Sequence, residues 1–137
     1  MTTVGTVMSQ NLFTVRMDDT IGTIREILKV AQFHHLLVVD GKKLVGVISD
    51  RDILRVISPF IGTLSEMNRD LDILERKVHQ IMTRRLITVN KTTGIDAAMK
   101  LLIEKSISCL PVVSPTGELQ GIVTWRDMLK AYVQKKI

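Results

Sequence analysis

Two short segments carry the same arrangement of a hydroxyl, an arginine and a carboxylate. They are Ser49-Asp50-Arg51-Asp52 and Thr124-Trp125-Arg126-Asp127. In each, an acid follows the hydroxyl residue by three positions, which is the capping-box spacing at the start of a helix. Capping alone accounts for the pattern, because the hydroxyl and the carboxylate bind backbone N–H groups that lack partners in the first helical turn.

Nucleotide binding is a second interpretation of the same two segments. A helix start favours phosphate, because its free N–H groups and the helix dipole attract anions. A carboxylate such as Asp52 or Asp127 accepts hydrogen bonds from sugar hydroxyls, and the arginine between each pair offers a fork that suits phosphate oxygens. The spacing leaves capping and ligand binding both open.

Other reactive residue types are sparse. His34 and His35 are adjacent on a predicted strand, where neighbouring side chains point to opposite faces, so we expect a solvated or cleft-lining pair rather than a metal site. Cys109 is the single cysteine, which excludes an internal disulfide and a cysteine-rich metal site and suits a buried thiol. Without a paired-carboxylate cleft, a metal-ligand cluster or a Gly-rich phosphate loop, we expect no catalytic residues and no enzyme activity.

The two segments occupy matching places in an internal repeat. Three stretches of the first copy align with three of the second, at an offset of 74 residues that becomes 75 after one insertion in a turn. The aligned pairs are Met8–Val15 with Met82–Val89, Leu36–Val39 with Leu110–Val113, and Leu44–Asp52 with Leu119–Asp127. We therefore divide the chain into repeat 1 (1–57), a linker (58–77) and repeat 2 (78–137).

Each copy predicts the order β-α-β-β-α. A short β segment (12–15, 86–89) precedes a helix with one apolar face, then two strands rich in Val and Ile, and finally a helix that opens at Ser49 or Thr124. The apolar residues of the first helices are Ile21, Ile24 and Leu28, and Ile95, Ala98, Met99 and Leu102. Those predicted on the buried side of the second helices are Ile53, Leu54 and Ile57, and Met128, Leu129 and Val133.

Two features connect these elements. Gly46 and Gly121 lie inside predicted strands, where a missing side chain permits close backbone approach. In the linker, Leu71, Leu74, Val78 and Ile81 recur at helical intervals among charged residues, which predicts one amphipathic helix packed against the repeats.

Composition restricts the class of protein. With 137 residues and 45% hydrophobic content, the chain is long enough for one compact domain or two half-size units sharing a core. No apolar stretch reaches the length of a membrane span and the first residues do not resemble a signal peptide, so we expect a cytoplasmic protein with no membrane insertion. The net charge of +5 favours anionic partners, but scattered cations and 4% aromatic content argue against nucleic acid.

The repeat resembles the cystathionine-β-synthase (CBS) domain. The resemblance is carried by a Met-x(5)-Thr-Val opening, a Leu-Pro-Val-Val strand at Leu110–Val113 and a Gly-φ-φ-[Ser/Thr]-x-x-Asp close, where φ is apolar. Two copies make a Bateman module. The resemblance implies an α+β fold of two β-α-β-β-α repeats related by a pseudo-two-fold axis and joined by a linker helix.

The resemblance also implies ligand-binding residues. In nucleotide-binding CBS pairs the residues matching Asp52 and Asp127 hold the ribose, those matching Ser49 and Thr124 lie near the phosphate, and each cleft draws on both repeats. One cleft is expected to combine Ser49, Arg51 and Asp52 with Met82, Ile87, Ser108 and Cys109. The other is expected to combine Thr124, Arg126 and Asp127 with Met8, Phe13, His34 and His35. Ile87 and Phe13 suit a purine sandwich or ordinary core, and both interpretations stay open.

We therefore expect a stand-alone sensor module that binds an adenosine-containing ligand such as AMP, ADP or ATP and requires no cofactor. The alternative is a ligand-free dimerisation or scaffold module. In either case the resemblance implies a homodimer that regulates a separate enzyme or transporter.

Overall fold

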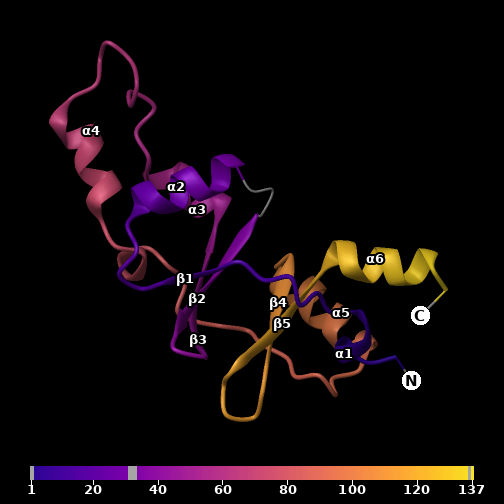
Figure 1. The fold of residues 1–137 in the computed structure, drawn as a ribbon. Helices are drawn as coiled ribbons and strands as arrows, with labels where there is room; N and C mark the ends of the chain where they lie inside the picture. The colour runs from indigo at the N-terminus through magenta and orange to yellow at the C-terminus, as the bar shows by residue number, and fades with distance from the viewer. Residues whose placement is uncertain (1, 31–33, 136) are drawn as a thin grey trace. The chain divides into compact units, whose positions relative to one another are not determined.

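The computed structural model describes residues 2–30, 34–135 and 137, and Figure 1 shows its helices and strands. The elements follow the order α1 (Val4–Val7), β1 (Thr14–Arg16), α2 (Ile21–Val30), β2 (His35–Asp40), β3 (Lys43–Ser49), α3 (Asp50–Val56), α4 (Asn68–Asp72), η1 (Ile73–Glu75), η2 (Val78–Gln80), α5 (Ile95–Lys105), β4 (Cys109–Val113), β5 (Leu119–Thr124) and α6 (Trp125–Val133). The predicted mixed α+β class is confirmed. Over these described residues, no helix combines the length and the apolar character needed to cross a bilayer.

The chain packs as two units, and each unit draws on both halves of the sequence. Unit 1 comprises Met1–Leu12, Lys42–Leu44 and Ile87–Ile137, and unit 2 comprises Phe13–Gly41 and Val45–Leu86. The opening segment of repeat 1 therefore belongs to the unit built on repeat 2, and the opening segment of repeat 2 belongs to the unit built on repeat 1.

Unit 2 is organised by a sheet with the strand order β1-β2-β3. β1 and β2 pair in parallel, with Val15 opposite Val38. α2 and α3 lie next to each other (Figure 1) and contribute Ile21, Ile24 and Ile53 to the core. Ile21 and Ile24 are fully buried, which confirms the predicted apolar face of the first helix.

Unit 1 is organised by the antiparallel hairpin of β4 and β5, in which Cys109 lies opposite Thr124. Its core includes Val4 of α1 as well as residues of α5 and α6. The predicted opening strand of the second copy, 86–89, is wrong: only Val89 forms a bridge, parallel to Val112. Its N–H donates to Pro111 O and its carbonyl accepts from Val113 N–H, so pairing is limited to this one position.

The two buried strand glycines each face a methionine of an opening segment. A Cβ added at Gly121 would lie 2.7 Å from Met8 Sδ and 3.0 Å from the carbonyl oxygen of Ser9. A Cβ added at Gly46 would lie 2.9 Å from Met82 Cγ. These separations are shorter than ordinary contacts, so the predicted close approach at Gly46 and Gly121 is confirmed.

The single amphipathic linker helix predicted from Leu71, Leu74, Val78 and Ile81 is wrong. The segment forms the short α4 and two 3-10 turns, η1 and η2, separated by extended backbone at Arg76 and Lys77. The chain at either end of this extended stretch pairs with the start of α2. Ile21 N–H donates to Arg76 O at 2.9 Å, and Val78 N–H donates to Asp19 O at 2.8 Å. Tertiary pairing therefore overrides the helical period, although Val78 is buried as predicted.

The second helices bury fewer residues than predicted. Ile53 and Met128 are buried, but Leu54, Leu129 and Val133 are 74%, 60% and 77% exposed. The apolar residues of these helices extend around more of the helix than the unit covers, so the three side chains remain in solvent. The prediction that Leu54, Leu129 and Val133 are buried in their own chain is wrong.

Candidate functional site

The helix start at Ser49 forms a complete capping box. Asp52 N–H donates to Ser49 Oγ at 3.2 Å, and Ser49 N–H donates to Asp52 Oδ2 at 2.8 Å. Ser49 is the last residue of β3 and has extended backbone, and α3 begins at the next residue. Ser49 and Asp52 are half-buried and Arg51 is exposed. We call these residues the unit 2 junction.

The unit 1 junction, Thr124 to Asp127, repeats this geometry at the start of α6. Asp127 N–H donates to Thr124 Oγ1 at 3.2 Å, and Thr124 N–H donates to Asp127 Oδ2 at 2.9 Å. The Thr124 hydroxyl also donates to Asp127 Oδ2 at 3.0 Å. Arg126 is exposed, as Arg51 is. The capping interpretation is confirmed at both junctions.

Capping occupies only one oxygen of each aspartate. At both junctions the oxygen that accepts the backbone N–H is Oδ2, so the capping bond does not use Oδ1. Asp52 Oδ1 lies 4.0 Å from the exposed Arg55 guanidinium, a separation too long for a firm ion pair. An ionised carboxylate oxygen has two acceptor positions. The cap therefore leaves each aspartate able to bind a pair of hydroxyl donors.

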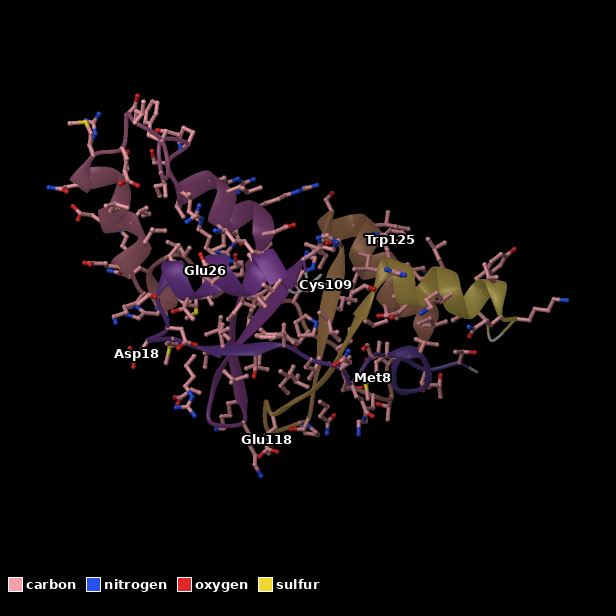
Figure 2. All side chains as sticks on the ribbon, turned by 45° about the horizontal axis from the view of Figure 1, so that its top comes forward. Met8, Asp18, Glu26, Cys109, Glu118 and Trp125 are labelled. Carbon is pink, nitrogen blue, oxygen red and sulfur yellow. The ribbon has the colours of Figure 1, made fainter. Side chains whose placement is uncertain are left out.

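The residues just before β2 and β4 lie beside these junctions. Asp50 N–H donates to His34 O at 3.0 Å, and Trp125 N–H donates to Ser108 O at 3.3 Å. His34 and Ser108 are exposed, whereas His35 is half-buried and Cys109 is buried. Figure 2 labels Cys109 and Trp125 in unit 1.

The remaining predicted residues are distributed between the two units. Met82 lies in unit 2 against Gly46, and Met8 lies in unit 1 against Gly121, so each methionine shares a unit with the junction for which it was predicted. Phe13 packs against the core of unit 2, and Ile87 packs against the core of unit 1. Within the units, His34 and His35 are grouped with Ser49, and Ser108 and Cys109 with Thr124. The predicted clefts that combine the two repeats stay a prediction.

The two junctions differ in charge. In unit 2, His34 Nδ1 lies 3.1 Å from Asp50 Oδ2. Burial opposes ionisation of Asp50, but hydrogen bonds from His34 and from the Arg51 backbone lower the pKa of this carboxyl below its ordinary value. In unit 1 the matching positions hold the neutral Ser108 and Trp125. The pair of His34 with Asp50 was not predicted from the sequence. The repeat alignment, which matches Asp50 with Trp125, is the signal that could have marked this difference.

Desolvation lowers the pKa of His35 below its ordinary value of 6.5, and the positive charges of His34 and Arg51 act in the same direction. Asp50 and Asp52 oppose the shift. The folded chain therefore disfavours protonated His35 relative to the unfolded chain. This contribution to the free energy of unfolding is fully present above the pKa that His35 has in the unfolded chain. It is lost as the pH falls through the lower pKa that His35 has in the folded chain.

We predict that the free energy of unfolding falls as the pH is lowered from 7.5 to 5, and that His35→Gln makes this fall shallower. Glutamine stays neutral throughout this range. The variant therefore lacks the proton uptake at residue 35 that stabilises the unfolded chain as the pH falls. Urea unfolding at a series of pH values measures the slope. Gln10→Ala, which changes an exposed residue that does not titrate, is the control and should keep the wild-type slope. An unchanged slope in His35→Gln would contradict the prediction.

The remaining candidates are the thiol of Cys109 and groups of metal-binding side chains. Burial raises the pKa of the Cys109 thiol to about 11, so the residue is a protonated, packed side chain at neutral pH. In the part of the chain that the structure describes, no group of three His, Cys, Asp or Glu side chains is arranged to hold a metal ion.

Known proteins match this chain over nearly its whole length. A family model described as CBS domain matches residues 4–59 and again residues 78–134. A CBS domain-containing protein of Dictyostelium discoideum is 36% identical over 132 residues, which cover 93% of this chain and 89% of that protein.

Two solved structures share the fold. The crystal structure of CBSX2 in complex with AMP superposes with a TM-score of 0.84 at 30% identity, covering 100% of both chains. The CBS domain pair of protein MJ0100, in complex with 5′-methylthioadenosine and S-adenosyl-L-methionine, superposes with a TM-score of 0.79 at 27% identity and covers 98% of both chains.

Proposed function

The chain belongs to the CBS domain family as a tandem pair, and on this premise we propose that it is a regulatory module that binds an adenosine-containing ligand such as AMP, ADP or ATP. The observation that carries the proposal is the pair of aspartates, Asp52 and Asp127, each of which uses Oδ2 in a cap and leaves Oδ1 outside it. The two similar structures that hold AMP or adenosyl ligands support this choice of ligand class.

In the proposed complex each aspartate accepts the two ribose hydroxyls through Oδ1. Ser49 or Thr124 then lies near the phosphate, and Arg51 or Arg126, exposed in the free chain, is able to turn its guanidinium toward phosphate oxygens. The apolar Met8 and Met82 and the half-buried Phe13 and Ile87 are the candidates for contact with the purine. The chain regulates a separate enzyme or transporter through this binding and carries out no reaction of its own.

We predict that an adenine nucleotide raises the melting temperature. A ligand that binds only the folded chain stabilises it by about 2.7 kcal/mol at a hundredfold excess over its dissociation constant. One kcal/mol moves the melting temperature of a domain by roughly 2–8 °C, so the rise should be about 5 °C or more. Differential scanning fluorimetry with millimolar AMP, ADP, ATP and S-adenosylmethionine measures it, with inorganic phosphate as the control for anion binding.

A ligand-free scaffold is the second candidate, and the exposed apolar residues of α6 favour it. Trp125, Leu129, Tyr132 and Val133 are all exposed and follow the i, i+4, i+7, i+8 spacing of one helix face. We call this set the α6 stripe. If none of the four adenosyl compounds changes the melting temperature, the scaffold function replaces nucleotide binding.

We also propose a homodimer, because the α6 stripe is a contiguous apolar face without a cover in its own unit. We predict a dimer mass at micromolar concentration by light scattering coupled to size exclusion. Leu129→Asp should shift the mass toward the monomer, since it places a charge in the stripe, while the exposed Lys100→Asp on α5 serves as the control. A monomer mass for the wild-type chain would contradict the homodimer.

A further inference from the structure

Asp50 lies between the two residues of unit 2 that the proposed function assigns to the phosphate. It is the first residue of α3 (Figure 1), directly after Ser49 and directly before Arg51. The matching position of unit 1 holds Trp125, which is neutral. The two junctions therefore differ by one carboxylate at the same place, on the side of the site where a phosphate is expected.

The His34 side chain is placed to neutralise this carboxylate. His34 Nδ1 lies 3.1 Å from Asp50 Oδ2, and the two side chains are 79% and 40% exposed. A backbone hydrogen bond from Asp50 N–H to His34 O, at 3.0 Å, holds the two residues together. The pKa of Asp50 lies below its ordinary value, so its carboxylate is ionised at neutral pH. Histidine is the side chain that changes charge between about pH 5 and 8, so the pair changes from a negative charge to a neutral ion pair within this range.

The remaining charged groups of the unit 2 junction do not compensate for this change. Those on α3 are Arg51, Asp52 and Arg55. On β2, desolvation lowers the pKa of His35, and this favours its neutral form. The two arginines balance the two aspartates of α3. The junction therefore carries no net charge while His34 is neutral and one positive charge once His34 is protonated.

The unit 1 junction has no such change. Its charged residues at the positions that match those of α3 are Arg126, Asp127 and Lys130. The positions that match the pair of His34 with Asp50 hold Ser108 and Trp125, whose side chains do not ionise at neutral pH. This junction therefore keeps one positive charge at the pH values at which the charge of the unit 2 junction changes.

We propose that Asp50 makes the unit 2 junction select against phosphate-bearing ligands near pH 8 and that protonation of His34 removes this selection near pH 6. The inference rests on the proposed function and adds to it a difference in ligand choice between the two junctions. A carboxylate close to a phosphate opposes its binding, and pairing the carboxylate with an imidazolium weakens that opposition. An adenosyl ligand without a phosphate is not repelled by Asp50.

Calorimetric titration with AMP and with adenosine, at pH 6 and at pH 8 and at constant salt, tests the inference. Asp127→Asn isolates the unit 2 junction, and Asp52→Asn isolates the unit 1 junction. The phosphate of AMP itself titrates near pH 6, so the change in AMP affinity at unit 1 serves as the reference for unit 2. Relative to that reference, AMP should bind unit 2 about tenfold more tightly at pH 6 than at pH 8, whereas the affinity for adenosine should change by less than about twofold.

Two substitutions, each made in the Asp127→Asn chain, separate the carboxylate from the imidazole. Asp50→Asn should bind AMP about tenfold more tightly at pH 8 than the chain that keeps Asp50, and should lose most of the pH dependence. His34→Gln leaves the carboxylate charged at both pH values, so it should bind AMP as weakly at pH 6 as at pH 8. A merely structural role of the pair would not make one variant tighter and the other weaker. Asp18→Asn, at an exposed position of unit 2, is the control and should keep the full pH dependence.

The possible results separate this inference from the proposed function. Full pH dependence in Asp50→Asn would overturn the inference, because His34 would then act on the ligand without Asp50. The same pH dependence at both junctions would also overturn it and would leave the proposed function intact. If neither AMP nor adenosine binds either chain at pH 6 or pH 8, the proposed function fails and the inference fails with it.

Discussion

Deletion of residues 1–12 is expected to unfold unit 1 while unit 2 keeps its structure. This segment contributes the fully buried Val4 to the core of unit 1. It also forms backbone hydrogen bonds with two other parts of that unit. Val4 N–H donates to Thr93 O at 2.8 Å, and Ser9 exchanges two backbone hydrogen bonds with Ile122, at 2.8 and 3.0 Å. Losing these groups exposes the edge of β5 and the start of α5 together.

Hydrogen exchange detects this loss residue by residue. Amides of α5, β4 and β5 should lose protection in the shortened chain, whereas those of β2 and β3 in unit 2 should keep it. Val4→Ala is the graded version and should cost roughly 1.5–3 kcal/mol, the value of burying an aliphatic side chain. Gln10→Ala changes an exposed residue of the same segment and should cost under about 0.5 kcal/mol. Unchanged protection of α5 in the deletion would refute the assignment of this segment to unit 1.

Asp52→Asn and Asp127→Asn are expected to lower the affinity for an adenine nucleotide by about ten- to a hundredfold at the altered junction. Asparagine keeps one oxygen that can accept the cap, so the free chain should lose at most about 1 kcal/mol of stability. An NH₂ group then replaces the second oxygen, and it cannot accept hydrogen bonds from the two ribose hydroxyls. Charge-assisted hydrogen bonds worth about 1.5–3 kcal/mol are then lost.

Calorimetric titration of the two variants separates the junctions, because each should lose one binding event or weaken one of two. The two effects need not be equal, since unit 2 carries the ionisable His34, His35 and Asp50 where unit 1 carries neutral residues. Asp18→Asn is the control: it removes the same charge from an exposed turn of unit 2 and should leave affinity unchanged. Wild-type affinity and stoichiometry in both Asp52→Asn and Asp127→Asn would place the nucleotide elsewhere.

Local patterns predicted the parts of the fold that are built from neighbouring residues. The capping boxes at Ser49 and Thr124 follow from a hydroxyl and an acid three positions apart, and both form. The apolar faces around Ile21 and Ile95 follow from helical spacing. The same reasoning failed in the linker, where Arg76 and Lys77 adopt extended backbone. There the Arg76 carbonyl and the Val78 N–H pair with Ile21 and Asp19, more than fifty residues away in the sequence.

The sequence by itself determined the repeat, most of the elements within each copy, the family and the capping roles of Asp52 and Asp127, because each of these is carried by residue types at fixed short spacings. Only the tertiary structure decided that Met1–Leu12 packs in the unit of repeat 2 and that Met82 packs in the unit of repeat 1. It also decided that Leu64, Leu129 and Val133 face solvent. Such outcomes depend on which distant surfaces bury each other, and hydrophobic periodicity shows that a face is apolar without showing what covers it.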